Sequence, residues 1–284
     1  MSGELVTTGR WLRDALAALL IFASTSALYF GTAWWFDRAT SMPMAYYDRL
    51  AEAFLHGRLH LEDPPGTYDL TEHEGRWYVP FLPLPAVVML PWVALRGVEG
   101  TNVVVFSSLA GGLSASLVWL LLAGLRRRGD IELDLGGRLW LTALFALGSA
   151  HWYVAAEASV WFLAQTFTVT FVALACWLAV RGRADWLVTT ALAVALWARP
   201  NVIFTWPLLA GIALARAQRD GRRGARVLLW RAVVSMIPLA LSVAGLAAYN
   251  VARFGDALDF GYARQNVGAD VRGDLATHGQ FNWR

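Results

Sequence analysis

Long apolar runs are the feature that most limits how this chain can fold. An α-helix needs about 20 apolar residues to cross a bilayer. Runs that reach or approach this length occupy residues 12–35, 102–125, 138–156, 160–180 and 232–249. Only 16% of the residues are charged, whereas a soluble domain carries about 25%. The sequence therefore predicts an all-α polytopic membrane protein.

The first apolar run begins after Arg10 and Arg13 and ends in the aromatic residues before Asp37. It is too long for the hydrophobic region of a signal peptide, and interfacial aromatic residues are typical of a membrane-spanning helix. We expect an uncleaved first helix.

The residue types present exclude several kinds of chemistry. All 24 basic residues are arginines, so no lysine can serve as a P-loop residue, a Schiff base or a general base. Cys176 is the single cysteine and lies in an apolar run, which excludes a disulfide or a cysteine-based metal site. The arginines lie in loops between apolar spans, so no nucleic-acid partner is expected.

Two apolar segments contain prolines that interrupt a regular membrane span. Residues 80–96 contain four prolines, and residues 186–215 are divided by the tripeptide Arg199-Pro200-Asn201. Proline cannot continue a regular helix without a break. Such a break is tolerated at membrane depth only where protein or water satisfies the backbone, so both segments suggest an internal cavity.

The loop arginines indicate how the two segments are arranged. Arg10 and Arg13 place the N-terminus in the cytoplasm by the positive-inside rule. If 80–96 does not cross the membrane and 186–215 forms a hairpin, all three later arginine-rich loops are also cytoplasmic. If 80–96 crosses the membrane, all three loops lie outside. These loops contain Arg126, Arg127, Arg128, Arg181, Arg183, Arg216, Arg219, Arg222, Arg223, Arg226 and Arg231. We therefore predict a re-entrant or juxtamembrane element at 80–96, and two half-length helices at 186–215 with Arg199 near the outer face.

This topology divides the chain into a transmembrane module at 1–249 and an extracytoplasmic loop at 250–284, the expected start of a longer C-terminal part. Residues 36–80 form a large outer loop with eight acidic residues against four arginines. A loop of this length is too long to be a simple connector, and it is the predicted location of the functional site.

Two carboxylates stand out in the outer loop. The apolar spacing in residues 44–61 predicts an amphipathic helix on the outer membrane face, ending near Gly57. Asp48 and Glu52 then lie one turn apart on one face. Their proximity can separate their pKa values and make one a general base; alternatively, both belong only to the hydrated face of the helix.

Other polar residues have weaker patterns. His56 and His60 resemble a metal-binding pair, but no further ligand follows at useful spacing; a divalent cation is possible and no metal site is predicted. Glu157 lies between two spans near the outer face, where a carboxylate is costly unless it is solvated or paired. Arg199 suits a phosphate ligand, or is an interfacial arginine that reaches for water.

Four stretches together resemble the GT-C superfamily of polytopic glycosyltransferases. They are YYDRLAEAFLHGRLHL (46–61), YVPFLPLPAVVMLP (78–91), ALWARPN (195–201) and YNVARFGDALDFGY (249–262). The closest likeness is to the bacterial branch related to protein O-mannosyltransferases and lipid A aminoarabinose transferases. The resemblance implies a GT-C-like helical bundle whose first extracytoplasmic loop carries juxtamembrane helices.

The resemblance also implies a reaction. An inverting enzyme of the cell envelope would move a sugar from a polyprenyl-phosphate donor to a hydroxyl of a lipid or glycan acceptor, a protein acceptor being less expected because Asp37 is followed by Arg38 rather than by a second acid. Asp37 and Asp48 match the position of the catalytic carboxylate. Further residues are expected to bind substrate: Glu52, Asp69, Arg76, Glu157 and Arg199.

Two other classes of function stay open on the sequence. One is a transporter or lipid flippase, although the full spans carry almost no buried ionisable groups and show no repeat. The other is a non-catalytic membrane assembly protein on the same scaffold. For the glycosyltransferase, the expected location is the bacterial cytoplasmic membrane, with membrane lipids around the spans and the active site on the extracytoplasmic side.

Overall fold

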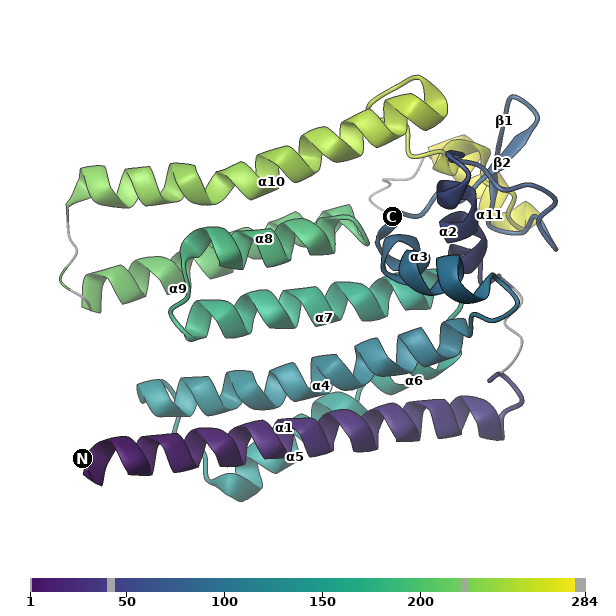
Figure 1. Cartoon of the computed structure of the whole chain (residues 1–284). Coiled ribbons are helices and arrows are strands. Elements are labelled where there is room, and N and C mark those ends of the chain that lie inside the picture. Colours follow the sequence, from purple (N-terminus) through teal and green to yellow (C-terminus); the bar gives the residue numbers. More distant parts are fainter. Residues whose placement is uncertain (1, 40–43, 220, 222–223, 279–284) are drawn as a thin grey trace.

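The computed structural model describes residues 2–39, 44–219, 221 and 224–278. Arg222 and Arg223 of the third arginine-rich loop lie outside the described residues. Helices dominate, and most of them run side by side along one direction (Figure 1). The long helices are α1 (Ser2–Trp35), α4 (Val103–Arg128), α7 (Val160–Val180) and α10 (Ala225–Phe254).

Those four helices are long and apolar enough to cross a membrane. A fifth candidate span consists of α5 (Leu135–Leu147) and α6 (Ala150–Glu157), which meet at a bend of 48°. The apolar run at 138–156 therefore forms two helices rather than one straight helix, and it is a candidate span if the bent pair crosses together. The break lies at Gly148-Ser149, because glycine is a poor helix residue and Ser149 Oγ accepts the amide hydrogen of His151 as a new N-cap.

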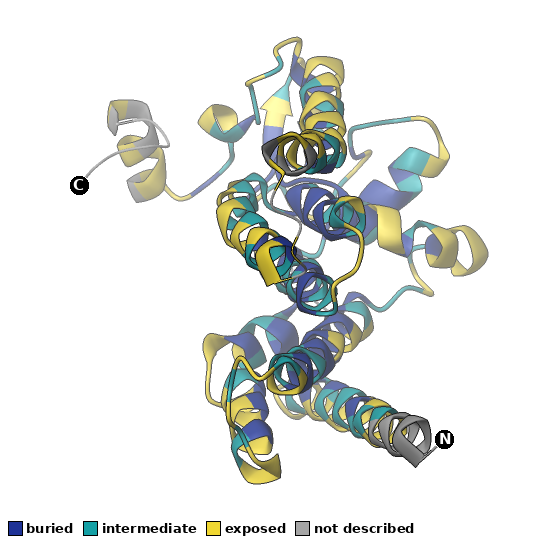
Figure 2. Cartoon of the chain, turned by 90° about the vertical axis from the view of Figure 1, so that its left-hand side faces the viewer, coloured by how far each residue is buried: buried dark blue, intermediate teal, exposed yellow. Residues whose placement is uncertain are grey.

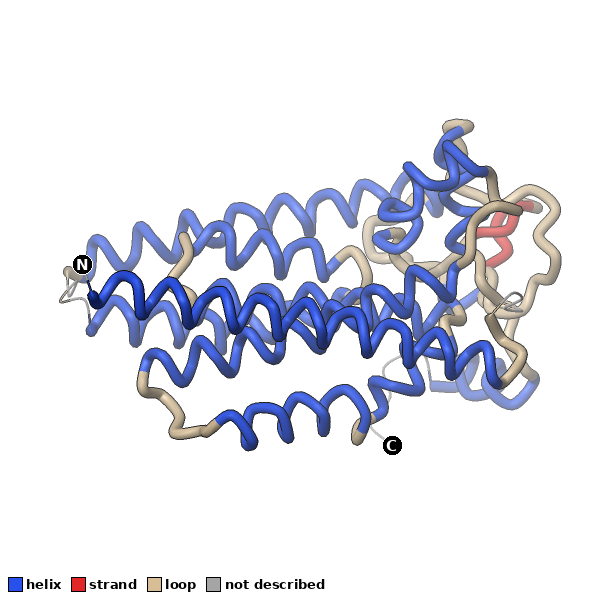
Figure 3. Tube along the Cα trace, turned by 60° about the horizontal axis from the view of Figure 1, so that its bottom comes forward, coloured by secondary structure: helices blue, strands red, loops and turns tan. Residues whose placement is uncertain are grey.

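Both ends of the bundle have a distinct character. We call the end that carries the N-terminus and the arginine-rich loops the basic end. The opposite end, which we call the loop end, carries α2 (Tyr47–Leu55), α3 (Leu84–Arg96), β1 (Thr71–His73), β2 (Arg76–Tyr78) and α11 (Ala269–His278) (Figures 1 and 3).

The proline-rich segment 80–96 stays at the loop end. Its helix α3 has 13 residues, about 20 Å at 1.5 Å per residue, which is short of a bilayer core of about 30 Å. It packs against α2, and α4 then starts from the same end (Figure 1). The backbone amide of Leu84 donates to the Trp197 carbonyl at 2.9 Å, which joins the segment to the break after α8. The segment therefore does not run the length of the bundle, as expected of a re-entrant or juxtamembrane element, and its position relative to a membrane stays a prediction.

The predicted hairpin at 186–215 is also present. Helix α8 (Asp185–Leu196) runs from the basic end, the 3-10 turn η1 (Pro200–Thr205) follows, and α9 (Trp206–Arg219) returns (Figure 1). Arg199 is in extended conformation just before Pro200, as expected of a residue that precedes proline.

Ion pairs at the basic end connect α1, α4 and α5. Asp14 accepts from Arg127 Nη1 at 2.6 Å and from Arg138 Nη2 at 2.7 Å. The ring of Trp11 has the guanidinium carbons of Arg127 and Arg181 at 3.9 Å and 3.6 Å from its centroid. The gathering of the N-terminal segment and the later arginine loops at one end is thus confirmed, while the side of the membrane on which they lie stays a prediction.

Small residues let the helices approach closely. A Cβ added at Gly111 would lie 2.7 Å from the Cβ of Ala155, and one at Gly112 would collide with Ser26 of α1. Because lipid provides no hydrophobic drive between helices, close backbone contact is a main source of their association. The buried faces turn toward one another and the exposed faces point outward (Figure 2).

The side of the membrane can be tested with single cysteines, since Cys176 is the only native one. In a Cys176→Ala background, we expect Arg96→Cys to react with a membrane-impermeant maleimide on intact cells. Arg126→Cys is expected to react only after permeabilisation. Both positions are exposed, at opposite ends of the bundle. Labelling of both cysteines from one side would contradict the topology.

Candidate functional site

The short helix α2 organises the loop end. It runs across the long helices rather than along them (Figure 1), and it buries Tyr47, Leu50 and Ala51 against α3 and the bundle. The prediction of an amphipathic helix here is confirmed, with helical residues from Tyr47 to Leu55 within the predicted 44–61. Asp48 and Glu52 occupy consecutive turns of its more polar face.

Asp48 lines a cavity of about 390 Å³. The polar residues that line this cavity beside Asp48 are Arg49, Glu99, Thr101 and Asn102. Asn102 caps α4 with its side-chain oxygen, while its Nδ2 donates to the Ala39 carbonyl at 2.7 Å. The segment after α1, the start of α2 and the start of α4 therefore meet around Asp48.

Burial raises the pKa of Asp48 from 3.8 to about 6. The Arg49 amide, which donates to Asp48 Oδ1 at 2.8 Å, and the Arg49 charge oppose this shift, whereas the negative charge of Glu52 adds to it. A carboxylate with a pKa near the working pH can both accept and release a proton, as a general base must. The structure thus brings Asp48 and Glu52 into electrostatic contact, as their spacing indicates.

Asp37 occupies a different environment. It is exposed directly after α1 and has a positive φ of 59°, a conformation that aspartate tolerates better than most residues. Of the two candidate bases, Asp48 and not Asp37 is among the described residues that line the 390 Å³ cavity.

Glu157 lies at the end of α6 and forms an ion pair with Arg38. The pair borders a second cavity of about 530 Å³ between α1 and α6, lined also by Trp152 and Tyr153. The carboxylate side chain is only 17% exposed. The pair connects the ends of α1 and α6, so the cost of a carboxylate near the membrane surface is partly offset by Arg38.

We call Arg199, Arg253, Tyr47 and Tyr262 the arginine cluster, because the charges of both arginines act on both tyrosines. Burial raises the pKa of both phenols, and the charges of the two arginines oppose this rise only in part. Arg199 Nη2 donates to the Trp161 carbonyl at 3.1 Å, and its guanidinium lies 5.6 Å from the centre of the Phe81 ring.

Arg253 is the most enclosed cation of this cluster. It is 3% exposed and donates to the Val79 carbonyl at 2.8 Å and to Asn250 Oδ1 at 2.7 Å. Within the described residues, Nε of Arg199, Nε of Arg253 and the hydroxyl of Tyr47 are buried without a hydrogen-bond partner. Buried donors in this state are costly, and an anionic oxygen would satisfy them.

Asp69 lies inside the junction between the outer loop and the residues after α10. It is 1% exposed, and Gln265 Nε2 lies 3.3 Å from its Oδ1. The backbone pairs alongside, with the Asp69 amide donating to Asn266 O at 2.8 Å and the Asn266 amide to Leu70 O at 2.7 Å. These contacts join segments about 200 residues apart in the sequence and give Asp69 a structural environment.

We expect Asp69→Asn to stabilise the protein at pH 7 to 8. Burial raises the pKa of Asp69 from 3.8 to about 6, so its charged form disfavours folding. The folded state then binds this proton more tightly than the unfolded state, and the stability contribution is present below pH 4 and is lost as pH rises through about 6. Thermal unfolding in detergent should show a gain at pH 8 that vanishes near pH 4. A gain of equal size at both pH values would contradict this account.

The remaining predicted residues lie on the outer surface of the loop end. Glu52 borders a small cavity of about 210 Å³ together with Arg49, His56 and Arg58. Arg76 is exposed on β2, next to the tight turn at Glu74-Gly75 that joins the two strands. In the part of the chain that the structure describes, no three His, Cys, Asp or Glu side chains gather closely enough to hold a metal ion.

Sequence reasoning missed Tyr47, Asn102 and Arg253 as parts of the site. The stretch 249–262 entered only through its resemblance, and nothing in it pointed to Arg253 as a buried cation. The available signal is an arginine at the end of an apolar span with Asn250 three residues before it, which places both on one helix face.

Comparison of the chain with models of known protein families, with curated proteins and with solved structures finds no match.

Proposed function

We propose that the chain is an integral membrane glycosyltransferase that moves a sugar from a polyprenyl phosphate to an acceptor hydroxyl, with its active site at the loop end. The observation that carries the proposal is the placement of two consecutive residues of α2. Asp48 lines the polar cavity, with a pKa raised to about 6 by burial, and the charges of Arg199 and Arg253 act on Tyr47, whose buried hydroxyl has no hydrogen-bond partner among the described residues. A candidate base and a candidate phosphate site thus meet across one helix.

In this mechanism the oxygen of the acceptor hydroxyl attacks the anomeric carbon. The Asp48 carboxylate accepts the proton of that hydroxyl at the same time. The bond between that carbon and the phosphate oxygen breaks, and the configuration inverts. The leaving phosphate gains negative charge, which Arg199 and Arg253 would stabilise. Asp37, at the end of α1, is the alternative base.

The cavity composition supports an acceptor site next to Asp48. Asn102 and Thr101 provide neutral hydrogen-bonding groups that can orient a sugar or lipid hydroxyl, and Arg49 keeps the local charge from becoming strongly negative. Glu52 would act through its charge on Asp48, and Glu157 with Arg38 would border the approach between α1 and α6.

The test is a transfer assay in proteoliposomes with a polyprenyl-phosphate sugar and a mixture of lipid and glycan acceptors. We expect release of polyprenyl phosphate that depends on an acceptor, with formation of a new glycosidic bond. A transporter or flippase would move the donor across the bilayer and leave its sugar–phosphate bond intact. Donor movement without bond cleavage would therefore refute the proposal.

A further inference from the structure

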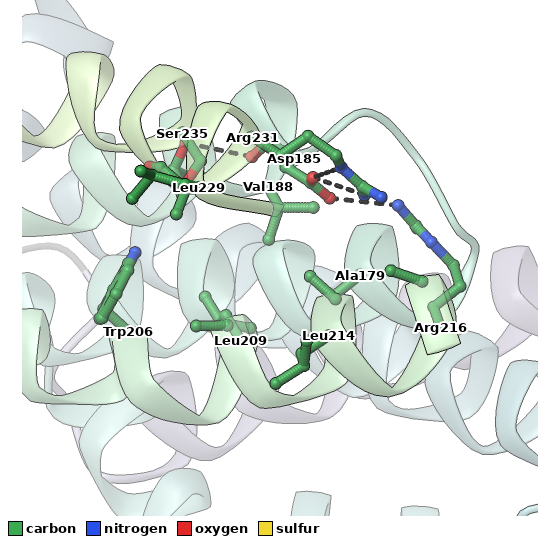
Figure 4. Close-up of a pocket in the computed structure, with 15 residues that line it drawn as sticks. Ala179, Asp185, Val188, Trp206, Leu209, Leu214, Arg216, Leu229, Arg231 and Ser235 are labelled. Carbon is green, nitrogen blue, oxygen red and sulfur yellow. Dashed lines mark hydrogen bonds and ion pairs between the residues drawn. The ribbon is translucent and has the colours of Figure 1, made fainter. Parts of the chain in front are cut away.

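A second candidate binding site, an apolar groove with a charged rim, lies at the basic end of the bundle, away from Asp48. An apolar groove of about 470 Å³ opens between α8, α9 and α10 (Figure 4). Aliphatic side chains form most of its walls, among them Val188, Leu209 and Leu214. Two of the large apolar side chains that line it, Leu214 and Leu229, are also exposed.

The rim of this groove carries an excess of positive charge. Asp185 accepts from Arg216 Nη2 at 3.1 Å and from Arg231 Nε at 2.8 Å, so one carboxylate faces two guanidinium groups (Figure 4). Arg216 also donates to the Arg183 carbonyl at 3.2 Å. Both guanidinium side chains keep about a fifth of their surface exposed, at 18% and 22%. The three rim residues Asp185, Arg216 and Arg231 therefore have a net charge of +1. Both guanidinium groups are exposed enough for a ligand to reach them.

We propose that this groove binds an anionic phospholipid of the adjacent leaflet, with one acyl chain between α8, α9 and α10 and the phosphate at Arg216 and Arg231. The apolar walls match an acyl chain, and the excess charge matches an anionic headgroup rather than a zwitterionic one. Basic residues next to a membrane surface attract anionic lipids in this way. The site is independent of the glycosyltransferase proposal, since it lies at the other end of the bundle.

Native mass spectrometry of the full chain in detergent tests the proposal. The protein is titrated with phosphatidylglycerol or with phosphatidylcholine of identical acyl chains. We expect one tightly retained phosphatidylglycerol and weaker retention of phosphatidylcholine. One arginine near a membrane surface changes anionic-lipid affinity about fivefold, so Arg231→Gln should lower the retention of phosphatidylglycerol by about that factor.

Two further variants and a control separate binding from damage to the fold. Asp185→Asn removes the rim anion, so we expect phosphatidylglycerol retention to rise, whereas loss of folding would lower it. Ala213→Phe fills the groove and should abolish the preference. Arg219→Gln is the control, because Arg219 lies at the same end but pairs with Asp130 at 2.9 Å and does not line the groove.

Equal retention of the two lipids by the unmodified chain would overturn the proposal. So would an Asp185→Asn variant that unfolds at the same temperature as the unmodified chain but retains phosphatidylglycerol no better than it. A dimer that Ala213→Phe dissociates, without any lipid preference, would assign the groove to a second copy of the chain instead.

Discussion

Asp48→Asn is expected to lower sugar transfer by about 10² to 10⁴-fold, because general base catalysis typically contributes a factor of this size. The variant retains the shape of the side chain but cannot accept the acceptor proton. Initial rates with saturating polyprenyl-phosphate sugar in proteoliposomes measure the effect. Asp37→Asn, in contrast, changes an exposed residue outside the cavity lining, and we expect less than a few-fold effect.

The pH profile identifies the base independently. Because burial raises the pKa of Asp48 to about 6, the rate should increase with pH and reach half of its plateau near pH 6. Glu52→Gln is the matched variant, one turn away on the same helix. It removes a negative charge that raises the pKa of Asp48, so the profile should move to lower pH while the plateau is retained. An Asp48→Asn variant with full activity would contradict the assignment, and loss of activity in Asp37→Asn alone would transfer the role to Asp37.

Arg199→Gln is expected to reduce kcat/KM for the polyprenyl-phosphate donor by about 10 to 100-fold. A hydrogen bond to a charged group is worth about 1.5–3 kcal/mol, and each 1.4 kcal/mol corresponds to a factor of ten. Arg199→Lys should recover part of this loss, because lysine retains the charge but not the two-pronged geometry of the guanidinium group. The loss should appear for the donor and not in the KM of the acceptor.

Arg76→Gln is the matched control for this experiment. Arg76 is also a cation of the loop end and a predicted substrate ligand, but it is exposed on β2. We expect the kcat/KM of Arg76→Gln to stay within a few-fold of the value for the unmodified chain. A larger effect in Arg76→Gln than in Arg199→Gln would assign the phosphate site to the β1–β2 hairpin instead of the arginine cluster. Thermal unfolding of each variant in detergent separates a lost contact from a lost fold.

Much of the fold could be predicted because its signals are local. Apolar length located the spans at 12–35, 102–125, 160–180 and 232–249, and each coincides with a long helix. The prolines of 80–96 and the break at Arg199-Pro200 predicted interruptions in two apolar segments, because proline removes a backbone donor wherever it occurs. The arginine loops predicted a shared end, and Asp14, Arg127 and Arg138 form ion pairs there.

The sequence was less informative where two distant segments meet. The outer loop contains β1 and β2, which form a two-stranded hairpin that we do not predict from the sequence. Thr71 Oγ1 donates to the Gly261 carbonyl at 2.9 Å. Gly261 has a φ of +82°, and a Cβ added there would lie only 2.7 Å from the Phe254 ring. Neither partner has a pattern of its own, because the contact depends on how α10 returns the chain to the loop end.

The sequence by itself determined that this is a helical chain suited to a membrane, with an acidic loop at one end, arginines at the other and Asp48 one turn from Glu52. Burial was decided only by the tertiary structure. Asp48 has a pKa of about 6 because the segment after α1 and the start of α4 close around it. Arg199 and Arg253 are 54 positions apart, and only the packing of α10 beside α8 brings both to Tyr47. Charge and spacing are properties of the sequence, whereas loss of water around a charge depends on every segment that packs against it.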